Sequence, residues 1–351
     1  MLNMVEEQLK MEVIRDNNRW NEVVSSFEKS DVYYTYEYCS AAAKQEGGIA
    51  RLIYYKNAYG TVIYPIIIRK IETRMEKPLF DITTPYGYGG PLIMGEKEIL
   101  KEFKSIFHSY CKSTGIVTEV IRFHPLLNNV SYSESYCELQ YIRKTTAVDL
   151  EFELPIIRES YSKMNRRNIS KAHKHGLQCR EVEKNTENIM VFWKLYKETM
   201  NRKNASNYYY FNKNFIEQQL KNTPISKSHL LFVFHGEKII SAVILFTAPL
   251  FAHYHLGASD SEYLSYKPNN LIFDFMVEVA KKEGSMLLHL GGGYQENDSL
   301  FKYKTSFTNN NLFDFYIGKN IFDHTLYNEI IADKEFSADS DEEYFPLYRS
   351  Y

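Results

Sequence analysis

The sequence predicts an α+β protein built as two tandem domains, each a mixed, mostly antiparallel sheet flanked by helices. The chain has 351 residues, which is more than one hydrophobic core usually fills. Its composition, 44% hydrophobic and 25% charged, is that of a globular protein. One order of elements, which begins with a hairpin, occurs twice along the chain. Together these observations favour two domains of one architecture.

The first copy begins with a β-hairpin. Strand-like runs at 51–55 and 61–68 flank Asn57-Ala58-Tyr59-Gly60, a sequence typical of a tight turn. A further strand, a loop rich in Gly and Pro, a helix and one more strand are then predicted, in that order, at 81–84, 85–91, 96–111 and 116–123.

The second copy has the same form. Its hairpin strands, 230–234 and 239–247, flank His235-Gly236-Glu237-Lys238. The elements that follow are predicted at 251–256, 257–268, 270–282 and 286–290. The residues of the two copies barely match, so the repeat is one of element order.

We place the domain boundary near Pro155, just before a helix, which gives domains at 1–155 and 156–330. Residues 188–221 add a helical pattern ahead of the second hairpin. The remainder, 331–351, contains an acidic, small-residue segment at 333–343 that is typical of a linker. The aromatic tip at 344–349 is expected to dock back on the body.

Composition limits the classes of function. A formal net charge of −2 argues against a surface built wholly for nucleic acid, although a local basic site is compatible with it. The 4 cysteines form no CxxC pair and are expected as buried thiols in a reducing cytosol. The N-terminus has no signal-peptide pattern, and the longest apolar run, 239–248, is too short to span a bilayer. We expect a cytoplasmic protein with no transmembrane segment.

A basic helix is predicted after Pro155. One face is expected to carry Ile157, Tyr161, Met164, Asn168 and Ala172, and the other to carry Lys163, Arg166, Arg167, Lys171 and Lys174. Gly176 is suited to end the helix, because its φ can become positive. The basic face can hold phosphates, or it can be an ordinary solvated charged face.

Lys304 is the strongest candidate for chemistry. Asn297 or Asp298 can cap a helix on which Leu300, Tyr303, Lys304 and Phe307 fall on one side. A lysine inside an apolar stripe is costly unless it is paired, neutral or lining a cavity. Its ammonium can stabilise the oxyanion that forms when an amine attacks a carbonyl, or its free amine can take the proton from that amine. Extension of the side chain to solvent is the alternative.

Two glycine-containing segments can line a ligand site. Gly291-Gly292-Gly293 follows a strand, but Glu296 stands where a GxGxxG motif needs its last glycine, so a tight turn or a close backbone approach is favoured. The segment 84–91 combines glycines with Tyr86 and Tyr88 and can line a cleft or form a plain turn. We expect no metal site, since His253 and His255 have no carboxylate or cysteine at metal spacing.

At these residues the chain resembles the Fem-type transferases of the GNAT superfamily, which add amino acids to peptidoglycan side chains from aminoacyl-tRNA. The similar motifs are, in chain order, Gly90-Pro91, Arg166-Arg167-Asn168-Ile169 with Lys171-Ala172 and Gly176-Leu177, Gly257-Ala258-Ser259 with Pro268, and Tyr303-Lys304-x-x-Phe307. Their order is specific, although each is short. The chain departs from the family pattern at Tyr303, which replaces Phe, at Phe275, which replaces Trp, and at His289, where an acidic residue is common.

The resemblance implies two GNAT-like domains with the acceptor in the cleft between them. It implies that Lys304 stabilises the transfer transition state, with Tyr303 and Phe307 beside it, and that Arg166 meets a phosphate of the acceptor. The other substrate-binding residues expected on this basis are Arg167, Lys163, Tyr86, Tyr88, Gly90, His255 and Ser259. No bound cofactor is expected. The partners would be an acyl donor, either aminoacyl-tRNA or acyl-CoA, and an amine acceptor linked to a nucleotide or a lipid, with peripheral membrane contact through that acceptor.

The hypotheses about function differ mainly in the acyl donor, which is either aminoacyl-tRNA or acyl-CoA. Acetyl-CoA enzymes of the superfamily place a glycine-containing loop before the long helix so that backbone N–H groups cradle the pyrophosphate. Residues 261–270 contain no glycine, which favours an aminoacyl donor. The alternatives are an acyl-CoA-dependent N-acetyltransferase for an amino sugar of a capsule or polysaccharide, and a non-catalytic protein that binds a sugar or nucleotide.

Overall fold

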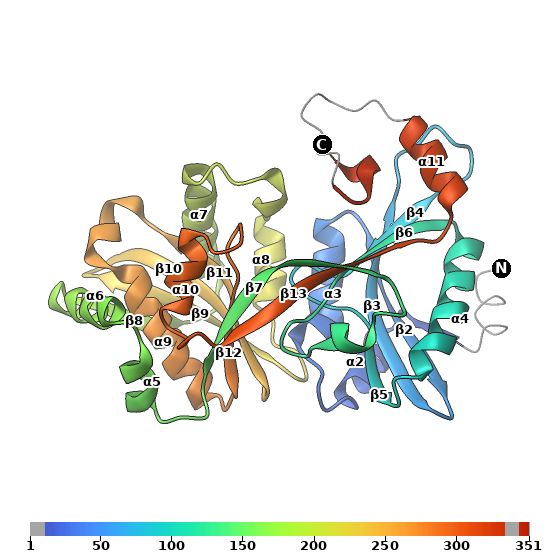
Figure 1. Cartoon of the computed structure of the whole chain (residues 1–351). Coiled ribbons are helices and arrows are strands. Elements are labelled where there is room, and N and C mark those ends of the chain that lie inside the picture. Colours follow the sequence, from blue (N-terminus) through green and yellow to red (C-terminus); the bar gives the residue numbers. More distant parts are fainter. Residues whose placement is uncertain (1–10, 334–343, 351) are drawn as a thin grey trace. The chain divides into compact units, whose positions relative to one another are not determined.

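The computed structural model describes residues 11–333 and 344–350. The chain forms two compact units (Figure 1): unit 1 comprises Met1–Ile142 and Phe315–Tyr351, and unit 2 comprises Arg143–Asp314. Unit 1 is therefore made of two chain segments, because the chain returns to it after completing unit 2. Domain boundaries at 155 and 330 stay predictions.

Unit 1 is built on a mixed sheet with the strand order β1-β2-β3-β4-β6-β13, and β5 pairs with β3. Every pairing is antiparallel except that of β4 with β6. The strands are β1 (Met11–Ile14), β2 (Ile49–Asn57), β3 (Gly60–Lys70), β4 (Phe80–Thr83), β5 (Leu92–Gly95), β6 (Ile116–Arg122) and β13 (Leu312–Ile321), the last of which begins in unit 2.

The helices of unit 1 cover this sheet. In α4 (Ile99–Thr114) the apolar residues recur every three or four positions, and they pack on β3 and β6 to form the main core. The helix ends at Gly115, whose φ of 77° suits a left-handed terminus. The other helices are α2 (Asn17–Ser25), α3 (Tyr36–Gln45) and α11 (His324–Ala332).

Unit 2 repeats the arrangement, with the strand order β7-β12-β11-β10-β9-β8. Again one pair is parallel, β11 with β12, and the rest are antiparallel. The strands are β7 (Glu138–Asp149), which begins in unit 1, β8 (Leu177–Val182), β9 (Lys227–His235), β10 (Lys238–Thr247), β11 (Phe251–Ser259) and β12 (Leu287–Gly291).

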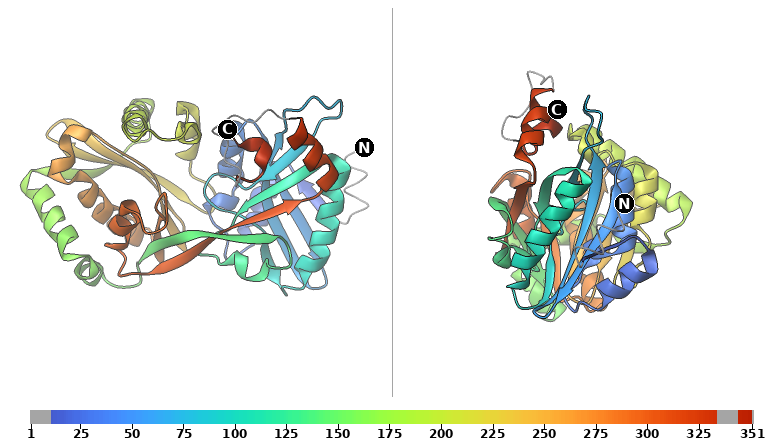
Figure 2. Two further views of the ribbon diagram at one scale, coloured as in Figure 1. Left: turned by 45° about the horizontal axis from the view of Figure 1, so that its top comes forward. Right: turned by 90° about the vertical axis from the view of Figure 1, so that its right-hand side faces the viewer.

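Helices lie on both faces of the unit 2 sheet (Figure 2). On one face α9 (Pro268–Lys282) packs with α5 (Leu154–Ser160), α6 (Lys163–Lys174) and α10 (Ser299–Thr305) in a single apolar core. On the other face α7 (Thr186–Arg202) packs on β10 and β11, next to α8 (Lys213–Gln219). The central strand β10 is consequently buried along almost its whole length.

The structure confirms the predicted fold class and the repeated order of elements. In each unit a hairpin (β2–β3, β9–β10) leads to an antiparallel third strand (β4, β11), and then through a helix (α4, α9) to a parallel strand (β6, β12). Gly60 and Gly236, at the predicted hairpin turns, both have positive φ. The repeat could be recognised because each copy uses local patterns in the same order.

The prediction of one helix after Pro155 is wrong. The chain turns at Tyr161, and the Ser162 side chain then caps a second helix by accepting a hydrogen bond from the Asn165 N–H. Because the helical period does not continue across the break, Met164 lies at the surface instead of in the core. The predicted end of the helix is confirmed, since Gly176 has a φ of 72°.

The C-terminal tip docks on unit 1, as predicted. Tyr348 is 2% exposed and packs with Leu79 and Val117. Its hydroxyl lies 2.5 Å from Thr118 Oγ1, and Arg349 Nε donates to Asp81 Oδ2 at 2.8 Å. The predicted acidic linker lies, apart from Asp333, outside the described residues.

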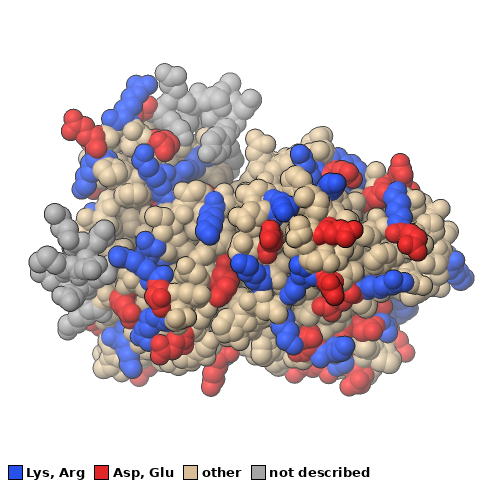
Figure 3. All heavy atoms as spheres, turned by 180° about the vertical axis from the view of Figure 1, so that it is seen from behind, with Lys and Arg blue, Asp and Glu red and all other residues tan. Residues whose placement is uncertain are grey.

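Three of the four cysteines are buried, as expected, and Cys179 is half-buried. Within 11–333 and 344–350, no helix has the length and apolar character needed to cross a membrane. On the face shown in Figure 3, basic and acidic side chains are interspersed without a large field of one sign. A site for anions on this face would therefore be local.

Candidate active site

The short helix α10 is held at its start by Asp298. This carboxylate accepts hydrogen bonds from the N–H groups of Tyr294, Gln295 and Phe301, at 2.7, 3.1 and 2.7 Å. A carboxylate at this point satisfies amides that a helix otherwise leaves without partners. The cap was one of the two predicted from the sequence, and it fixes where the following residues of α10 point.

Lys304 points inward from α10 and is 7% exposed. Its Nζ donates to the carbonyl oxygen of Gly292 at 2.8 Å and lies 5.5 Å from the centre of the Tyr254 ring. Within the described part of the chain, no carboxylate forms an ion pair with it. The burial predicted from its apolar stripe is therefore confirmed, and the side chain does not extend to solvent.

Burial lowers the pKa of Lys304 to about 7, because an ammonium loses its hydration in the interior. The positive charges of Lys203 and Arg143 lower this pKa further, while the carboxylate of Asp298 opposes them. At neutral pH the side chain is therefore divided between ammonium and free amine. It can act in either of the two roles expected from the sequence.

The three glycines form a tight turn that presents a carbonyl to Lys304. Gly291 has a φ of 75°, and a Cβ on Gly293 would lie 2.1 Å from a carboxylate oxygen of Asp298. Arg143, on β7, holds the turn from the other side by donating to the carbonyl oxygens of Gly293 and Tyr294, both at 2.5 Å. The glycines thus permit close approach of the cap and of β7.

Tyr303 and Phe307 form the aromatic wall of this site. The ring of Phe273, on α9, lies 5.3 Å from each of them, and Phe307 also meets Tyr161 at 5.1 Å. The hydroxyl of Tyr303 is buried, and it has no hydrogen-bond partner in the described residues. Burial raises its pKa well above the usual value, so the hydroxyl stays protonated. The wall anchors α10 on α9.

Ser259 and His255 lie on β11. The backbone of Ser259 is bonded to α7, since its N–H donates to Thr199 Oγ1 at 3.1 Å and its carbonyl accepts from Arg202 at 2.9 Å. His255 is adjacent to Tyr254 in the strand and therefore points to the opposite face of the sheet, where its ring lies 4.4 Å from that of Phe246. Burial lowers the pKa of His255 to about 3, so its ring is neutral. Substrate binding by these two residues stays a prediction.

The outward side of α6 is uniformly basic. Five cationic side chains and one serine line an open hollow of about 570 Å³, and we call them the basic stripe: Lys163, Arg166, Arg167, Ser170, Lys171 and Lys174. The predicted grouping of the cations on one face is thus confirmed. Arg166 Nη1 donates to the carbonyl of Glu159 on α5, and within 11–333 and 344–350 none of the five cations pairs with a carboxylate. Phosphate binding at this face stays a prediction.

Partly buried hydrogen bonds join α6 to the end of the helix that carries Lys304. The Ser162 N–H donates to the Ser306 carbonyl at 2.8 Å, and Asn165 Nδ2 donates to Ser306 Oγ at 2.6 Å. Asn270, in the first turn of α9, donates through Nδ2 to Asn165 Oδ1 at 3.0 Å. Three helices therefore meet within two residues of Lys304.

The loop predicted to line a cleft belongs to unit 1. The Tyr86 carbonyl accepts from the Tyr38 hydroxyl at 2.6 Å, and the Gly90 carbonyl accepts from the Tyr34 hydroxyl at 3.0 Å. The rings of Tyr88 and Tyr33 meet edge to face at 5.4 Å. Tyr86 and Tyr88 are half-buried, and their predicted role in substrate binding stays open to test.

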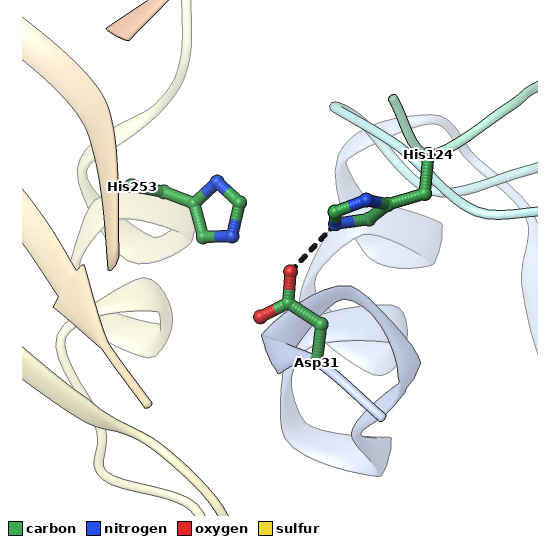
Figure 4. A group of neighbouring side chains, drawn as sticks. All are labelled: Asp31, His124 and His253. Carbon is green, nitrogen blue, oxygen red and sulfur yellow. Dashed lines mark hydrogen bonds and ion pairs between the residues drawn. The ribbon is translucent and has the colours of Figure 1, made fainter. Parts of the chain in front are cut away.

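A buried Asp–His pair lies next to this loop in unit 1 (Figure 4). His124 Nε2 lies 2.6 Å from Asp31 Oδ2, and His124 Nδ1 accepts from the Leu127 N–H at 3.1 Å. Because Nδ1 accepts, the proton of a neutral ring lies on Nε2 and points to the carboxylate. Both ring nitrogens are thus used within unit 1, and the pair orders the loop that follows β6.

The start of α9 offers few backbone donors to a phosphate. Pro268 has no N–H, the Lys267 N–H donates to Leu264, and the Asn270 N–H donates to Lys267. The glycine-free segment before it forms a short 3-10 helix, Ser261–Tyr266. The absence of an ordinary pyrophosphate cradle here stays a prediction.

Sequence reasoning missed Arg143 and Tyr254 as parts of the Lys304 site. Both residues lie in strands whose pairing carries them to α10 from distant parts of the chain. Neither has a local signal, because an arginine or tyrosine in a strand is ordinary. Only the order of strands in the sheet could have indicated them.

Comparison with known proteins agrees with this architecture. Residues 160–305 match the family model of the acetyltransferase (GNAT) domain. The structure is similar to FemX, with a TM-score of 0.68 and 14% identity over 91% of this chain and 99% of that chain. No curated protein matches the sequence significantly.

Two further solved structures have a similar fold. L-PGS from Bacillus licheniformis has a TM-score of 0.58 and 10% identity, and covers 90% of this chain and 95% of that chain. The C-terminal domain of a putative lysylphosphatidylglycerol synthetase from Agrobacterium fabrum has a TM-score of 0.55 and 12% identity, over 91% and 96%.

Residues 160–305 thus carry a GNAT acetyltransferase domain, which supports an acyltransferase activity. The two units together have the tandem fold that is seen in FemX. The donor and the acceptor are the parts of its function that need a proposal.

Proposed function

We propose that the protein transfers an aminoacyl or acyl group to an amine of a cell-envelope precursor, of peptidoglycan or polysaccharide, and that aminoacyl-tRNA is its favoured donor. The observation that carries the proposal is the buried Lys304, whose pKa lies near 7 and whose Nζ is placed by the Gly292 carbonyl. The similarity of this fold to that of FemX supports an acceptor of the peptidoglycan class, because the name of FemX places it among the Fem-type proteins.

In the reaction, the acceptor nitrogen attacks the acyl carbonyl carbon and forms a C–N bond. The C–O bond of an aminoacyl ester, or the C–S bond of a thioester, then breaks, and the proton lost by the amine passes to the leaving oxygen or sulfur. As an ammonium, Lys304 stabilises the oxyanion of the intermediate. As a free amine, it accepts the proton of the attacking nitrogen. The low polarity around Tyr303 and Phe307 strengthens either interaction.

The donor preference rests on the start of α9. With Pro268 at the first position and the amides of Lys267 and Asn270 already bonded, few N–H groups remain for a pyrophosphate. The second candidate is an acyl-CoA-dependent N-acetyltransferase for an amino sugar, which the acetyltransferase family match favours. Calorimetric titration with acetyl-CoA and CoA separates the two. Saturable micromolar binding would favour the second candidate, and no binding would favour the aminoacyl donor.

The catalytic test compares Lys304→Ala with Lys302→Ala, an exposed lysine on the same helix. We expect Lys304→Ala to lower kcat by about 100-fold or more, since removal of one oxyanion-stabilising group commonly costs that much. Lys302→Ala should retain the wild-type rate, and circular dichroism should show both variants folded. A Lys304→Ala variant with wild-type turnover would remove the proposed role and favour a non-catalytic binding protein.

Acceptor binding is tested separately at Arg166. A contact with an acceptor phosphate is made equally in the ground state and the transition state, so its loss raises KM more than it lowers kcat. We expect this pattern for Arg166→Ala. An unchanged KM would assign Arg166 to the contact between α5 and α6 alone.

A further inference from the structure

The basic stripe of α6 has more charge than one acceptor phosphate requires. Its cations lie at positions 163, 166, 167, 171 and 174, which fall on one side of a helix at 3.6 residues per turn. The helix itself contains no Asp or Glu. A face of this kind has a positive potential that no acidic residue of the helix itself cancels.

Large aliphatic side chains lie at the edge of this stripe. Met164 is 71% exposed, and it neighbours Arg167 on the helix surface because the two are three residues apart. Ile156, on the outward side of α5, is 53% exposed. Arg166 donates to the Glu159 carbonyl, one turn after Ile156, so α5 and α6 lie next to each other (Figure 1).

Cations beside exposed aliphatic side chains fit a lipid surface better than an RNA. A bilayer buries the aliphatic groups in the headgroup region and pairs the cations with lipid phosphates. RNA would pair with the cations but would leave Met164 and Ile156 in water, and its binding surfaces usually carry aromatic rings for stacking.

The position of the stripe connects it to the reaction. The Ser162 and Asn165 contacts with Ser306 are at least partly buried, and they tie α6 to the end of α10. Lys304 lies two residues before Ser306 on that helix. A surface bound by α6 would thus be held at a fixed, short distance from the catalytic lysine.

We propose that the basic stripe, with Met164 and Ile156, docks the protein on an anionic phospholipid bilayer. The inference rests on the proposed function in one respect: docking on a bilayer would bring the protein to an acceptor that is linked to a lipid. The binding itself is independent of catalysis, since none of its contacts involves Lys304. Because the attraction acts between exposed charges, it should weaken as the ionic strength rises.

The test is co-sedimentation of the full-length protein with vesicles, without donor or acceptor. We expect binding to an equal mixture of phosphatidylglycerol and phosphatidylcholine, and none to phosphatidylcholine alone. The double variant Lys171→Glu, Lys174→Glu should bind at least about tenfold more weakly, since each basic residue near an anionic surface contributes about fivefold. Met164→Asp should also weaken binding.

The matched control reverses two lysines on another helix of the same unit. Lys194→Glu with Lys197→Glu makes the same charge change on α7, on the opposite face of the sheet, and should bind vesicles as the wild type does. If this control loses as much vesicle binding as the α6 variant, the loss depends on net charge alone and the proposal is wrong. The proposal is also wrong if the wild-type protein does not bind the phosphatidylglycerol vesicles.

Two competing polyanions complete the test. If bulk tRNA binds wild-type protein more tightly than the vesicles do, and loses affinity in the α6 variant but not in the α7 variant, the stripe is an RNA surface and the proposal is wrong. If tRNA and inorganic phosphate, each added at the same total charge as the anionic lipid, do not reduce vesicle binding, the proposal is supported. Because vesicle binding is measured without turnover, a failure of docking and a failure of the proposed transfer are separate results.

Discussion

At the scale of the residue, burial without a counter-charge gives Lys304 its chemical character. The side chain has a carbonyl oxygen as its hydrogen-bond acceptor and an aromatic ring nearby, and two neighbouring cations disfavour its charged form. A surface lysine would be almost wholly protonated at neutral pH. Lys304 is instead poised between its two forms, so its role should be visible in the pH dependence of the rate.

We expect kcat to change through a single ionisation near pH 7. Below this pKa Lys304 is an ammonium and above it a free amine, so a rate that falls as the pH rises assigns it to oxyanion stabilisation, and a rate that rises assigns it to proton transfer. The measurement is the pH–rate profile of wild type, with Lys304→Arg as the control that keeps its charge throughout. A flat profile between about pH 6 and 9 would contradict the lowered pKa.

Glu119 is a second buried ionisable group, in unit 1. Burial raises its pKa to about 7, although Asn320 donates to Oε2 at 2.5 Å and Tyr136 donates to Oε1 at 3.2 Å. The folded state therefore holds a proton that the unfolded state releases near pH 4.5. Its stabilising effect is complete below that pH and is lost as the pH rises through about 7.

We expect Glu119→Gln to remove this loss, because an amide is neutral at every pH. The variant should exceed the wild type in stability at pH 8 by on the order of 2 kcal/mol, and the difference should shrink at pH 5. Urea unfolding at the two pH values, followed by the fluorescence of Trp20 in a Trp193→Phe background, measures this in unit 1. A difference that does not depend on pH would show that Glu119 is already ionised in the folded protein.

At the scale of the element, α10 has only seven residues and depends on its cap and its aromatic wall. Asp298 binds three backbone amides and also contributes a negative charge that raises the pKa of Lys304. One side chain thus sets both the position and the ionisation of the candidate catalytic residue.

We expect Asp298→Ala to lower the free energy of unfolding by about 1 kcal/mol, the usual effect of losing an N-cap, and to reduce kcat as well. The ionisation in the pH–rate profile should also move to lower pH. The control is Asp323→Ala, which removes a similar cap from α11, where Asp323 accepts from the Leu326 N–H at 3.0 Å. It should lower stability and leave kcat unchanged, and an equal loss of rate in both variants would argue against a local role for Asp298.

At the scale of the whole molecule, the sequence predicted what depends on local order. Both hairpins, the helices α4 and α9 and the inward Lys304 follow from patterns within about twenty residues. The last strand of unit 1, β13, was not predicted, because its pairing with β6 joins segments separated by the whole of unit 2. For the same reason the contact between Glu119 and Asn320 could not be predicted from the sequence. A glutamate in a strand usually lies at the surface, and Glu119 is buried only because β13 pairs with β6.

The return of the chain to unit 1 makes the stability of that unit depend on its last residues. Tyr348 is buried against Leu79 and Val117, and Arg349 bonds both Asp81 Oδ2 and, at 2.7 Å, the carbonyl of Lys70. These contacts lie on strands β3, β4 and β6 or next to them, so the tip packs on three neighbouring strands of the unit 1 sheet. Loss of the tip should therefore lower the stability of unit 1.

We expect Tyr348→Ala to lower the stability of unit 1 by about 3 kcal/mol, since it leaves a large cavity and exposes the Thr118 hydroxyl. Unfolding of unit 1 is followed by Trp20 in the Trp193→Phe background, and unfolding of unit 2 by Trp193 in the Trp20→Phe background. Tyr348→Phe, which removes only the hydrogen bond to Thr118, should cost about 1 kcal/mol and shows how much of the effect is packing. An equal shift in both tryptophan signals would mean that the two units unfold together, and no shift in either would mean that the tip contributes nothing to the fold.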